Sequence, residues 1–274
     1  MKKILFTTFT AICISAIIPC KTYALDITLG ATTWYALSEQ NYTQDKKRSP
    51  GVINNSIAKS DPAFLYGPTL AVRFTNDFNI TFVYLYGHFE TEKDQGGGRK
   101  SKTKFSRSDS DIALNYRLGD YFKVFAGMKY LSYGITPART DSVTFEISKN
   151  VDMHTSYGPG LGLSATVPVI GNLFALGTVS GLYLWGSHGA DITDMTVGTP
   201  PNYQQRSVNL KYNEYGINTT VSLAYYIAPA STVISLGGRF QYLKADYTKN
   251  SIYLKSIEFT SYGVTLTATY TFSI

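Results

Sequence analysis

The chain ends in SYGVTLTATYTFSI, Ser261–Ile274, and every second residue of this stretch is apolar or aromatic up to the last one. The positions between them carry only Gly, Thr or Ser. Because successive side chains point to opposite faces of a β-strand, this pattern predicts a strand with one apolar and one small polar face. Terminal residues fray unless something holds them. A strand patterned to its last residue therefore indicates a terminus that pairs fully with another strand.

The N-terminus has the pattern of a secretory signal. Lys2 and Lys3 precede the apolar stretch ILFTTFTAICISAIIP, and small residues follow in TYA, which ends at Ala24. A short basic region, an apolar region and a small-residue cleavage site are the three parts of a signal peptide. We expect residues 1–24 to be a signal peptide and residues 25–274 to form the exported domain. A lipoprotein signal ending at Cys20 is the alternative, which the preceding proline fits poorly.

The expected mature chain has no cysteine, because Cys13 and Cys20 both lie within the signal. This excludes a disulfide scaffold and a thiolate metal site. The full-length net charge of +6 falls to +3 once Lys2, Lys3 and Lys21 are removed. Export and this modest charge argue against a nucleic-acid partner. The sequence contains no recognisable nucleophile elbow, zinc motif or phosphate loop, so we predict no cofactor and no metal.

Period-two patterning recurs in ten segments, each long enough for the roughly 9–11 residues that a membrane-spanning strand needs. The predicted strands are Asp26–Leu37, Phe64–Thr75, Asn79–Glu90, Ser106–Leu118, Tyr121–Tyr133, Thr155–Val169, Leu173–Gly186, Val208–Ile227, Thr232–Lys244 and Ser256–Ile274.

The connections between these segments alternate strictly in length. The turns NDF, GD, IGN and APAS are short and rich in turn-forming residues. The long connections are Ser38–Ala63, Thr91–Phe105, Gly134–His154, Ser187–Ser207 and Ala245–Lys255. Short periplasmic turns and longer extracellular loops are typical of a closed, antiparallel, up-and-down outer-membrane β-barrel. We therefore predict an all-β transmembrane barrel of about ten strands with both termini in the periplasm.

A soluble ligand-binding barrel has the same alternation with apolar side chains inside, and it is a less favoured alternative. The distribution of charge favours the membrane barrel, because charged residues share the face opposite the aliphatic ones. The residues expected to line the lumen are Arg73, Arg107, Asp109, Asp111, Arg117, Lys123, Lys129, Glu214 and Arg239. Aromatic residues also gather near strand ends, among them Trp34, Tyr35, Tyr130, Tyr133, Tyr183 and Trp185. Aromatic girdles of this kind mark the two lipid–water boundaries.

The lumen-facing charged residues allow two interpretations of the barrel interior. In a barrel this narrow they form an internal salt-bridge network, since confined charges need partners. Alternatively, their basic excess lines a thin, anion-preferring pore. Asp109 and Asp111 are expected near the extracellular rim, either paired with Arg107 and Arg117 or presented as a carboxylate pair for a cation or for acid–base chemistry.

The ending YTFSI resembles the C-terminal signal of bacterial outer-membrane β-barrel proteins, although Ile274 stands where that signal usually has Phe. The resemblance implies recognition of the strand Tyr262–Ile274 by the barrel-assembly machinery. It also implies outer-membrane lipid and lipopolysaccharide as surroundings. The basic, glycine-rich segment Lys93–Lys104 is a candidate contact for lipopolysaccharide or another extracellular ligand. We expect a non-enzymatic barrel that serves as a narrow small-solute channel or as a structural, surface-interacting protein.

The strand number and loop layout also resemble the ten-stranded omptin proteases, whose site is an Asp pair facing an Asp–x–His couple. Here the third strand leads into HFETEKD, with His88, Glu90 and Glu92, and the fourth long loop begins with WGSHGADITD. His188 follows Gly186 instead of Asp, so we expect it to be a solvated loop histidine. The alternative is a rim-sited hydrolase in which His188 acts with Glu90 and Glu92 or with the carboxylates of SRSDSD, Ser106–Asp111.

Overall fold

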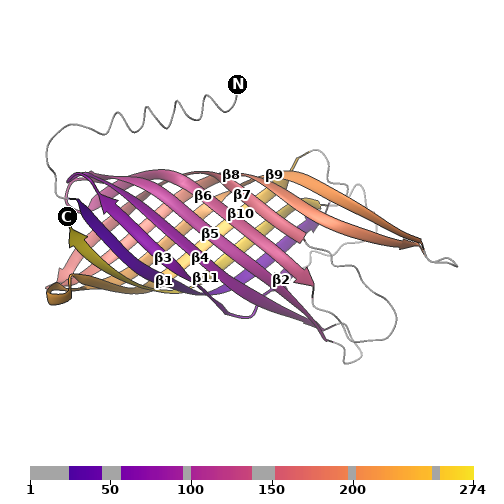
Figure 1. Cartoon of the computed structure of the whole chain (residues 1–274), viewed down its shortest axis with the longest axis horizontal. Helices are drawn as coiled ribbons and strands as arrows, with labels where there is room; N and C mark the ends of the chain where they lie inside the picture. Colours follow the sequence, from indigo (N-terminus) through magenta and orange to yellow (C-terminus); the bar gives the residue numbers. More distant parts are fainter. Residues whose placement is uncertain (1–24, 45–56, 95–99, 138–151, 197–201, 249–253) are drawn as a thin grey trace, which may run out of the picture.

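The computed structural model describes residues 25–44, 57–94, 100–137, 152–196, 202–248 and 254–274. They form a single antiparallel sheet that closes on itself as a ten-stranded up-and-down barrel, with one additional short strand (Figure 1). The strands are β1 (Asp26–Gln44), β2 (Ile57–Lys59), β3 (Ala63–Arg73), β4 (Phe78–Asp94), β5 (Lys100–Leu118), β6 (Phe122–Pro137), β7 (Asp152–Ile170), β8 (Leu173–Thr196), β9 (Asn202–Ile227), β10 (Thr232–Tyr247) and β11 (Leu254–Ser273). Within the described residues no helix is long and apolar enough to cross a membrane.

The C-terminal strand closes the barrel, as its patterning predicts. β11 pairs with β1 from Asp26↔Ser273 at one end to Gln44↔Leu254 at the other. The last residue takes part as well, because the backbone N–H of Ile274 donates to the carbonyl oxygen of Leu25 at 2.9 Å. A closed barrel leaves no row of unpaired backbone groups, which hydrocarbon would not tolerate.

The short connections lie at the same end of the barrel as the start of β1 and the C-terminus (Figure 1). Two of these turns depend on glycine, since Gly119 and Gly171 have φ angles of +69° and +55°. A side chain is disfavoured in this left-handed region. Another of them is the 3₁₀ turn η1 (Ala228–Ala230), which ends at Ser231 in the same left-handed conformation. We call this the turn end, and the opposite end the loop end.

The strands extend much further toward the loop end than the sequence predicts. β4 continues to Asp94 and β5 starts at Lys100, so most of the predicted loop 91–105 is a β-hairpin. Most of the predicted loop 187–207 is likewise strand, because β8 and β9 reach Thr196 and Asn202. The regular apolar alternation of the sequence ends before the backbone pairing does, so the sequence pattern places the strand ends too early. Strand β2 lies within the predicted loop 38–63.

The outer surface of the barrel carries an aliphatic band with aromatic side chains at its borders. The exposed aliphatic residues of this band include Leu29, Ile112, Leu114, Leu161, Leu163, Val221, Leu223, Leu236, Val264 and Leu266. Exposed aromatic residues include Tyr66, Tyr130, Tyr157, Trp185, Tyr215 and Tyr262 toward the loop end and Tyr116, Phe122, Tyr225 and Tyr270 toward the turn end. An outward apolar band between two aromatic girdles is the surface that a bilayer requires of a β-barrel.

Two aromatic residues expected in the girdles lie inside the barrel instead. Trp34 has no exposed surface and Tyr133 is 3% exposed. Tyr35, next to Trp34, faces outward and is 44% exposed, and Tyr130, three positions before Tyr133, faces outward and is 41% exposed. The cause is strand parity, because residues an odd number of positions apart in a strand lie on opposite faces.

Candidate functional site

The barrel lumen is divided into a filled half and a hollow half. Toward the loop end the inward side chains are buried, and Leu65, Leu131 and Leu243 have no exposed surface. Toward the turn end the inward side chains, such as Thr69 and Thr269, are half-exposed. A closed wall with half-exposed inward residues encloses open space. The predicted lumen residues therefore occupy two different environments.

A cluster of five charged side chains lies at the boundary between the two halves. We call Arg107, Asp109, Asp111, Lys129 and Arg239 the charge cluster. Asp109 lies at its centre and is 1% exposed. Its carboxylate accepts hydrogen bonds from Nη2 of Arg107 at 3.1 Å and from Nη2 of Arg239 at 3.3 Å. Lys129 donates to the other carboxylate oxygen of Asp109. Three cations thus compensate one fully buried carboxylate, as burial of charge requires.

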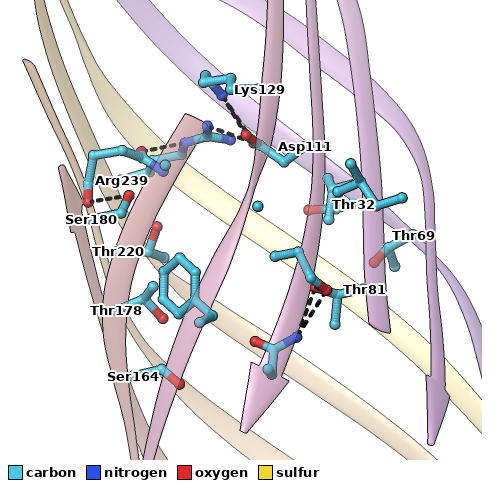
Figure 2. Close-up of a pocket in the computed structure, with 18 of the residues that line it drawn as sticks. Thr32, Thr69, Thr81, Asp111, Lys129, Ser164, Thr178, Ser180, Thr220 and Arg239 are labelled. Atoms are coloured by element: carbon cyan, nitrogen blue, oxygen red, sulfur yellow. Dashed lines mark hydrogen bonds and ion pairs between the residues drawn. The ribbon is translucent and has the colours of Figure 1, made fainter. Parts of the chain in front are cut away.

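Asp111 forms the edge of the charge cluster that borders the hollow half (Figure 2). Nζ of Lys129 lies 2.9 Å from each of its carboxylate oxygens, and Nη2 of Arg239 lies 3.8 Å away. The side chain of Asp111 is 34% exposed, whereas that of Lys129 is 1% exposed. One carboxylate of the cluster is therefore fixed in position and still accessible from the hollow half.

Trp34 packs between two of these cations. The guanidinium carbon of Arg107 lies 5.0 Å from the ring centre of Trp34, and that of Arg239 lies 4.6 Å from it. Arg107 is also 5.2 Å from the ring of Tyr133 and donates from Nη1 to Ser261 at 2.7 Å. Desolvated cation–π contacts stabilise such groups by about 2 kcal/mol or more. The sequence carried a signal for this position, because Trp34 shares a strand face with polar lumen residues.

Apolar side chains fill the lumen between the charge cluster and the loop end. We call this region the plug. It consists of two groups of buried residues: Trp34, Ala36, Leu65, Leu85, Phe89 and Phe105, and Leu131, Tyr133, Leu182, Leu184, Tyr212, Leu243, Ala245, Ile257 and Phe259. Phe89 stacks on Phe105 with ring centres 4.9 Å apart, and Tyr133 stacks on Phe259 at 5.0 Å. The loop-side half therefore has a packed core, which the period-two pattern of the single strands does not predict.

The remaining predicted lumen charges lie apart from the charge cluster. Glu214 is 1% exposed in the filled half, where the hydroxyl of Ser156 donates to its carboxylate at 2.6 Å. Arg73 lies at the turn end, 3.3 Å from Asp26. Lys123 is half-buried in the second position of β6.

Two expectations about the carboxylate pair are wrong. Asp109 is buried inside the lumen, not placed at the extracellular rim, because the strands continue well beyond it. Arg117 does not pair with either carboxylate. It lies at the turn end of β5, where it donates to the carbonyl of Gly119 at 2.8 Å and to Asp120 at 3.0 Å. Eight residues along an extended strand place Arg117 far from Asp109.

The expectation of a solvated loop histidine at position 188 is also wrong. His188 lies within β8, is 6% exposed and faces the lumen. Its ring stacks on His154 at 3.7 Å, and its Nδ1 lies 2.9 Å from the hydroxyl oxygen of Tyr247. Glu90 instead lies on the outer face, 2.8 Å from Lys104, so the barrel wall separates it from His188.

Other candidates of the hydrolase alternative are equally dispersed. His88 is exposed on the outer face against Tyr86, with ring centres 5.0 Å apart. The side chain of Glu92 and most of the segment Lys93–Lys104 lie outside the residues whose side chains are described. Across the described residues no group of three His, Asp or Glu side chains is arranged to hold a metal ion.

A scan against protein-family models finds no match for this sequence, and no curated protein sequence matches it. Among solved structures, the outer-membrane protease OmpT of Escherichia coli matches 91% of this chain and 97% of its own, with a TM-score of 0.58 and 14% identity. A major outer-membrane protein of Thermus thermophilus matches 91% of this chain and 100% of its own, with a TM-score of 0.39 and 11% identity. Ail of Yersinia pestis, solved with the heparin analogue sucrose octasulfate, matches 90% of this chain and 99% of its own, with a TM-score of 0.33 and 11% identity. The chain shares the closed β-barrel fold of OmpT. At these identities the likeness concerns fold alone.

Proposed function

We propose that this chain is a non-conducting, non-enzymatic barrel of the bacterial outer membrane that acts through its loop end as a structural and surface-contact protein. The observation that carries the proposal is the closed lumen. Side chains of Arg107, Asp109 and Lys129 are 0–2% exposed, and the apolar plug covers them toward the loop end. A continuous aqueous path for ions has no room in this half of the barrel.

The charge cluster favours closure over conduction. A pore lining keeps its charges solvated so that they attract mobile ions. Here Asp109 is compensated by three protein cations, and removing one partner of such a buried arrangement costs about 3–5 kcal/mol. Of the basic residues that suggested an anion path, Arg107, Lys129 and Arg239 are therefore engaged in ion pairs with Asp109, and both arginines also contact Trp34.

The loop end supports the contact role, because ion pairs lie on the outer wall there. Glu39 pairs with Lys59 at 3.1 Å, Glu90 with Lys104 at 2.8 Å, and Lys244 with Glu258 at 3.9 Å. A lysine on the lipid face costs about 2–4 kcal/mol at the bilayer midplane and little beyond the interface. We infer that this part of the wall projects from the hydrocarbon into the lipopolysaccharide layer. Its solid interior makes it a rigid support for the extracellular loops.

The non-enzymatic part of the proposal rests on where the carboxylates of the hydrolase alternative lie. Glu90 is on the outer face of the barrel, and Asp109 is buried and held by three cations, so neither is placed to act with His188 as an acid–base pair. Export by the segment 1–24 and assembly through the strand Tyr262–Ile274 complete the proposal. Both remain predictions from the sequence.

The deciding experiment is conductance of the refolded protein in a planar bilayer under a salt gradient. We expect a silent bilayer from protein whose folding is verified by heat-modifiable migration on gels. Discrete conductance steps with anion preference, weakened by Lys129→Ala, would establish the narrow-channel reading instead. Peptidase activity abolished by His188→Ala would establish the hydrolase reading.

A further inference from the structure

The hollow half of the lumen contains a cavity of about 490 Å³, directly below the charge cluster. Binding sites for small molecules usually have volumes of about 300–1,000 Å³. The cavity therefore has the size of a ligand site. It lies on the turn-end side of the charge cluster, where Leu182 alone of the plug residues borders it, so the plug does not fill it.

Ten threonine and serine residues bring hydroxyl groups to the walls of this cavity, among aliphatic and glycine residues. Ser164, Thr178 and Thr220 line one side, and Thr32, Thr69 and Thr81 line the other (Figure 2). Thr178 and Thr220 are direct neighbours across β8 and β9. Each hydroxyl can donate one hydrogen bond and accept two. Hydroxyl groups on two opposite walls can form hydrogen bonds with a small ligand that carries several hydroxyl groups itself.

The roof of the cavity combines fixed charges of both signs. Asp111, Lys129 and Arg239 line it, and Lys129 holds both oxygens of Asp111 at 2.9 Å. The carboxylate has further acceptor positions and is 34% exposed, so it can receive hydroxyl protons from below. Each cation of the roof has a carboxylate partner, and the carboxylate of Asp111 is more exposed than either cation, so the roof presents no accessible unpaired cation to an anionic ligand.

An aromatic ring supplies the apolar part of the cavity wall. Phe125 lines the cavity and packs against Gly162 of the neighbouring strand. A Cβ at Gly162 would lie 2.3 Å from Cζ of Phe125, so the ring can occupy this place only opposite a glycine. Ligand sites combine such apolar surfaces with a few polar groups that fix orientation. The C–H faces of a sugar ring fit an aromatic wall, while its hydroxyls fit threonines.

Entry to the cavity is from the turn end. The inward residues Thr28 and Thr271 are half-exposed there, and Asp26 keeps 25% of its side-chain surface exposed. The inward residues Leu65 and Leu131 beyond the charge cluster have none. The turn end of an outer-membrane barrel faces the periplasm.

We infer that the hollow half of the lumen is a periplasm-facing binding site for a small, neutral, polyhydroxylated molecule of the sugar class. The inference goes beyond the proposed function and does not depend on it, since the site is separated from the loop end by the plug.

Saturation-transfer NMR on the refolded barrel tests the inference, with glucose, glucuronate and glucosamine as neutral, anionic and cationic probes of similar shape. The detergent must lack a sugar headgroup, and lauryldimethylamine oxide is suitable. The variant Thr178→Val/Thr220→Val removes two wall hydroxyls at nearly constant volume. The control Thr219→Val makes the same change on the neighbouring outward-facing position of β9. Phe125→Leu removes the aromatic wall independently of the hydroxyls.

Glucose is expected to give the strongest transfer, to bind about tenfold more weakly to the double variant, and to bind Thr219→Val like wild type. Phe125→Leu is expected to weaken glucose binding as well, which keeps the test valid if the double variant does not fold. Transfer to none of the three probes would mean that water alone fills the cavity and would overturn the inference. Preference for either charged probe, or equal binding by all variants, would overturn it too.

Discussion

The guanidinium carbon of Arg239 on β10 lies 4.6 Å from the ring centre of Trp34 on β1, although 205 positions separate the two residues in the chain. Arg107 approaches the same ring at 5.0 Å from the opposite part of the barrel. Trp34 thus connects the charge cluster to the plug, since it belongs to one and contacts the other.

Replacing Trp34 by Ala is expected to destabilise the barrel by about 3–5 kcal/mol, the usual cost of removing a buried Trp, and the loss of the cation–π interactions adds to this cost. The measurement is the urea midpoint of unfolding in lipid vesicles. Tyr35→Ala, which removes an aromatic ring from the outer face, is the matched control and should cost distinctly less. Equal losses for the two variants would contradict an internal role for Trp34.

Replacing Asp109 by Asn leaves Arg107, Lys129 and Arg239 short of one negative charge in a buried site. We expect a loss of about 3–5 kcal/mol in the free energy of unfolding. The double variant Asp109→Asn/Lys129→Met should recover part of this loss, because it removes a cation together with its partner. Asp120→Asn is the control, since this exposed carboxylate pairs only with Arg117 at the turn end among its described contacts. A double variant less stable than Asp109→Asn would argue against charge compensation.

Several features of the site were accessible from the sequence, and the reason is strand parity. Period-two alternation assigned residues such as Arg107, Asp109 and Lys129 to the lumen, and the same rule applied strictly would have placed Trp34 there. It would also have placed His188 inside, because His188 shares the face of Leu184 in the same strand. The sequence pattern instead leaves His188 in a loop, because the apolar alternation ends at Gly186 whereas β8 continues to Thr196.

Cross-lumen partners were not accessible from the sequence. Arg239 reaches Asp109 from a strand 130 residues away in the chain, whereas Arg117, only eight residues away, does not. These contacts depend on strand tilt and on the stagger of the barrel, which no single strand encodes. The plug could not be predicted from the sequence for the same reason, because its residues come from separate strands that meet only in the closed barrel.

Gly162 and Phe125 provide a test of the wall of the hollow half. Gly162→Ala is expected to destabilise the barrel by about 1–3 kcal/mol, because the added Cβ would lie 2.3 Å from Cζ of Phe125 and 2.4 Å from the backbone oxygen of Val179. Adding Phe125→Leu to Gly162→Ala should restore part of the loss, because it vacates the space of the ring and leaves the contact with Val179. Gly181→Ala is the control, since no atom lies within 4 Å of a Cβ added there. Loss without rescue by Phe125→Leu would locate the strain in the backbone.

The closing strand makes a prediction about assembly. Deleting residues 271–274 removes the partners of Asp26, Ile27 and Thr28 on β1 and leaves their backbone groups as an unpaired edge within the barrel wall. Tyr270 belongs to the aromatic border at the turn end, so these groups lie at the lipid–water boundary, and the deletion also removes Phe272 from the predicted assembly signal. We therefore expect less heat-modifiable barrel in the outer-membrane fraction than from the full chain. Thr271→Ala removes one side-chain hydrogen bond, to Thr28 at 2.8 Å, while keeping the backbone pairing, and should assemble normally. A truncated chain that assembles as well as Thr271→Ala would show that the last turn-end pairs are dispensable. Recognition of the C-terminal strand would then have to reside in Tyr262–Tyr270, whose pairing with β1 the deletion leaves intact.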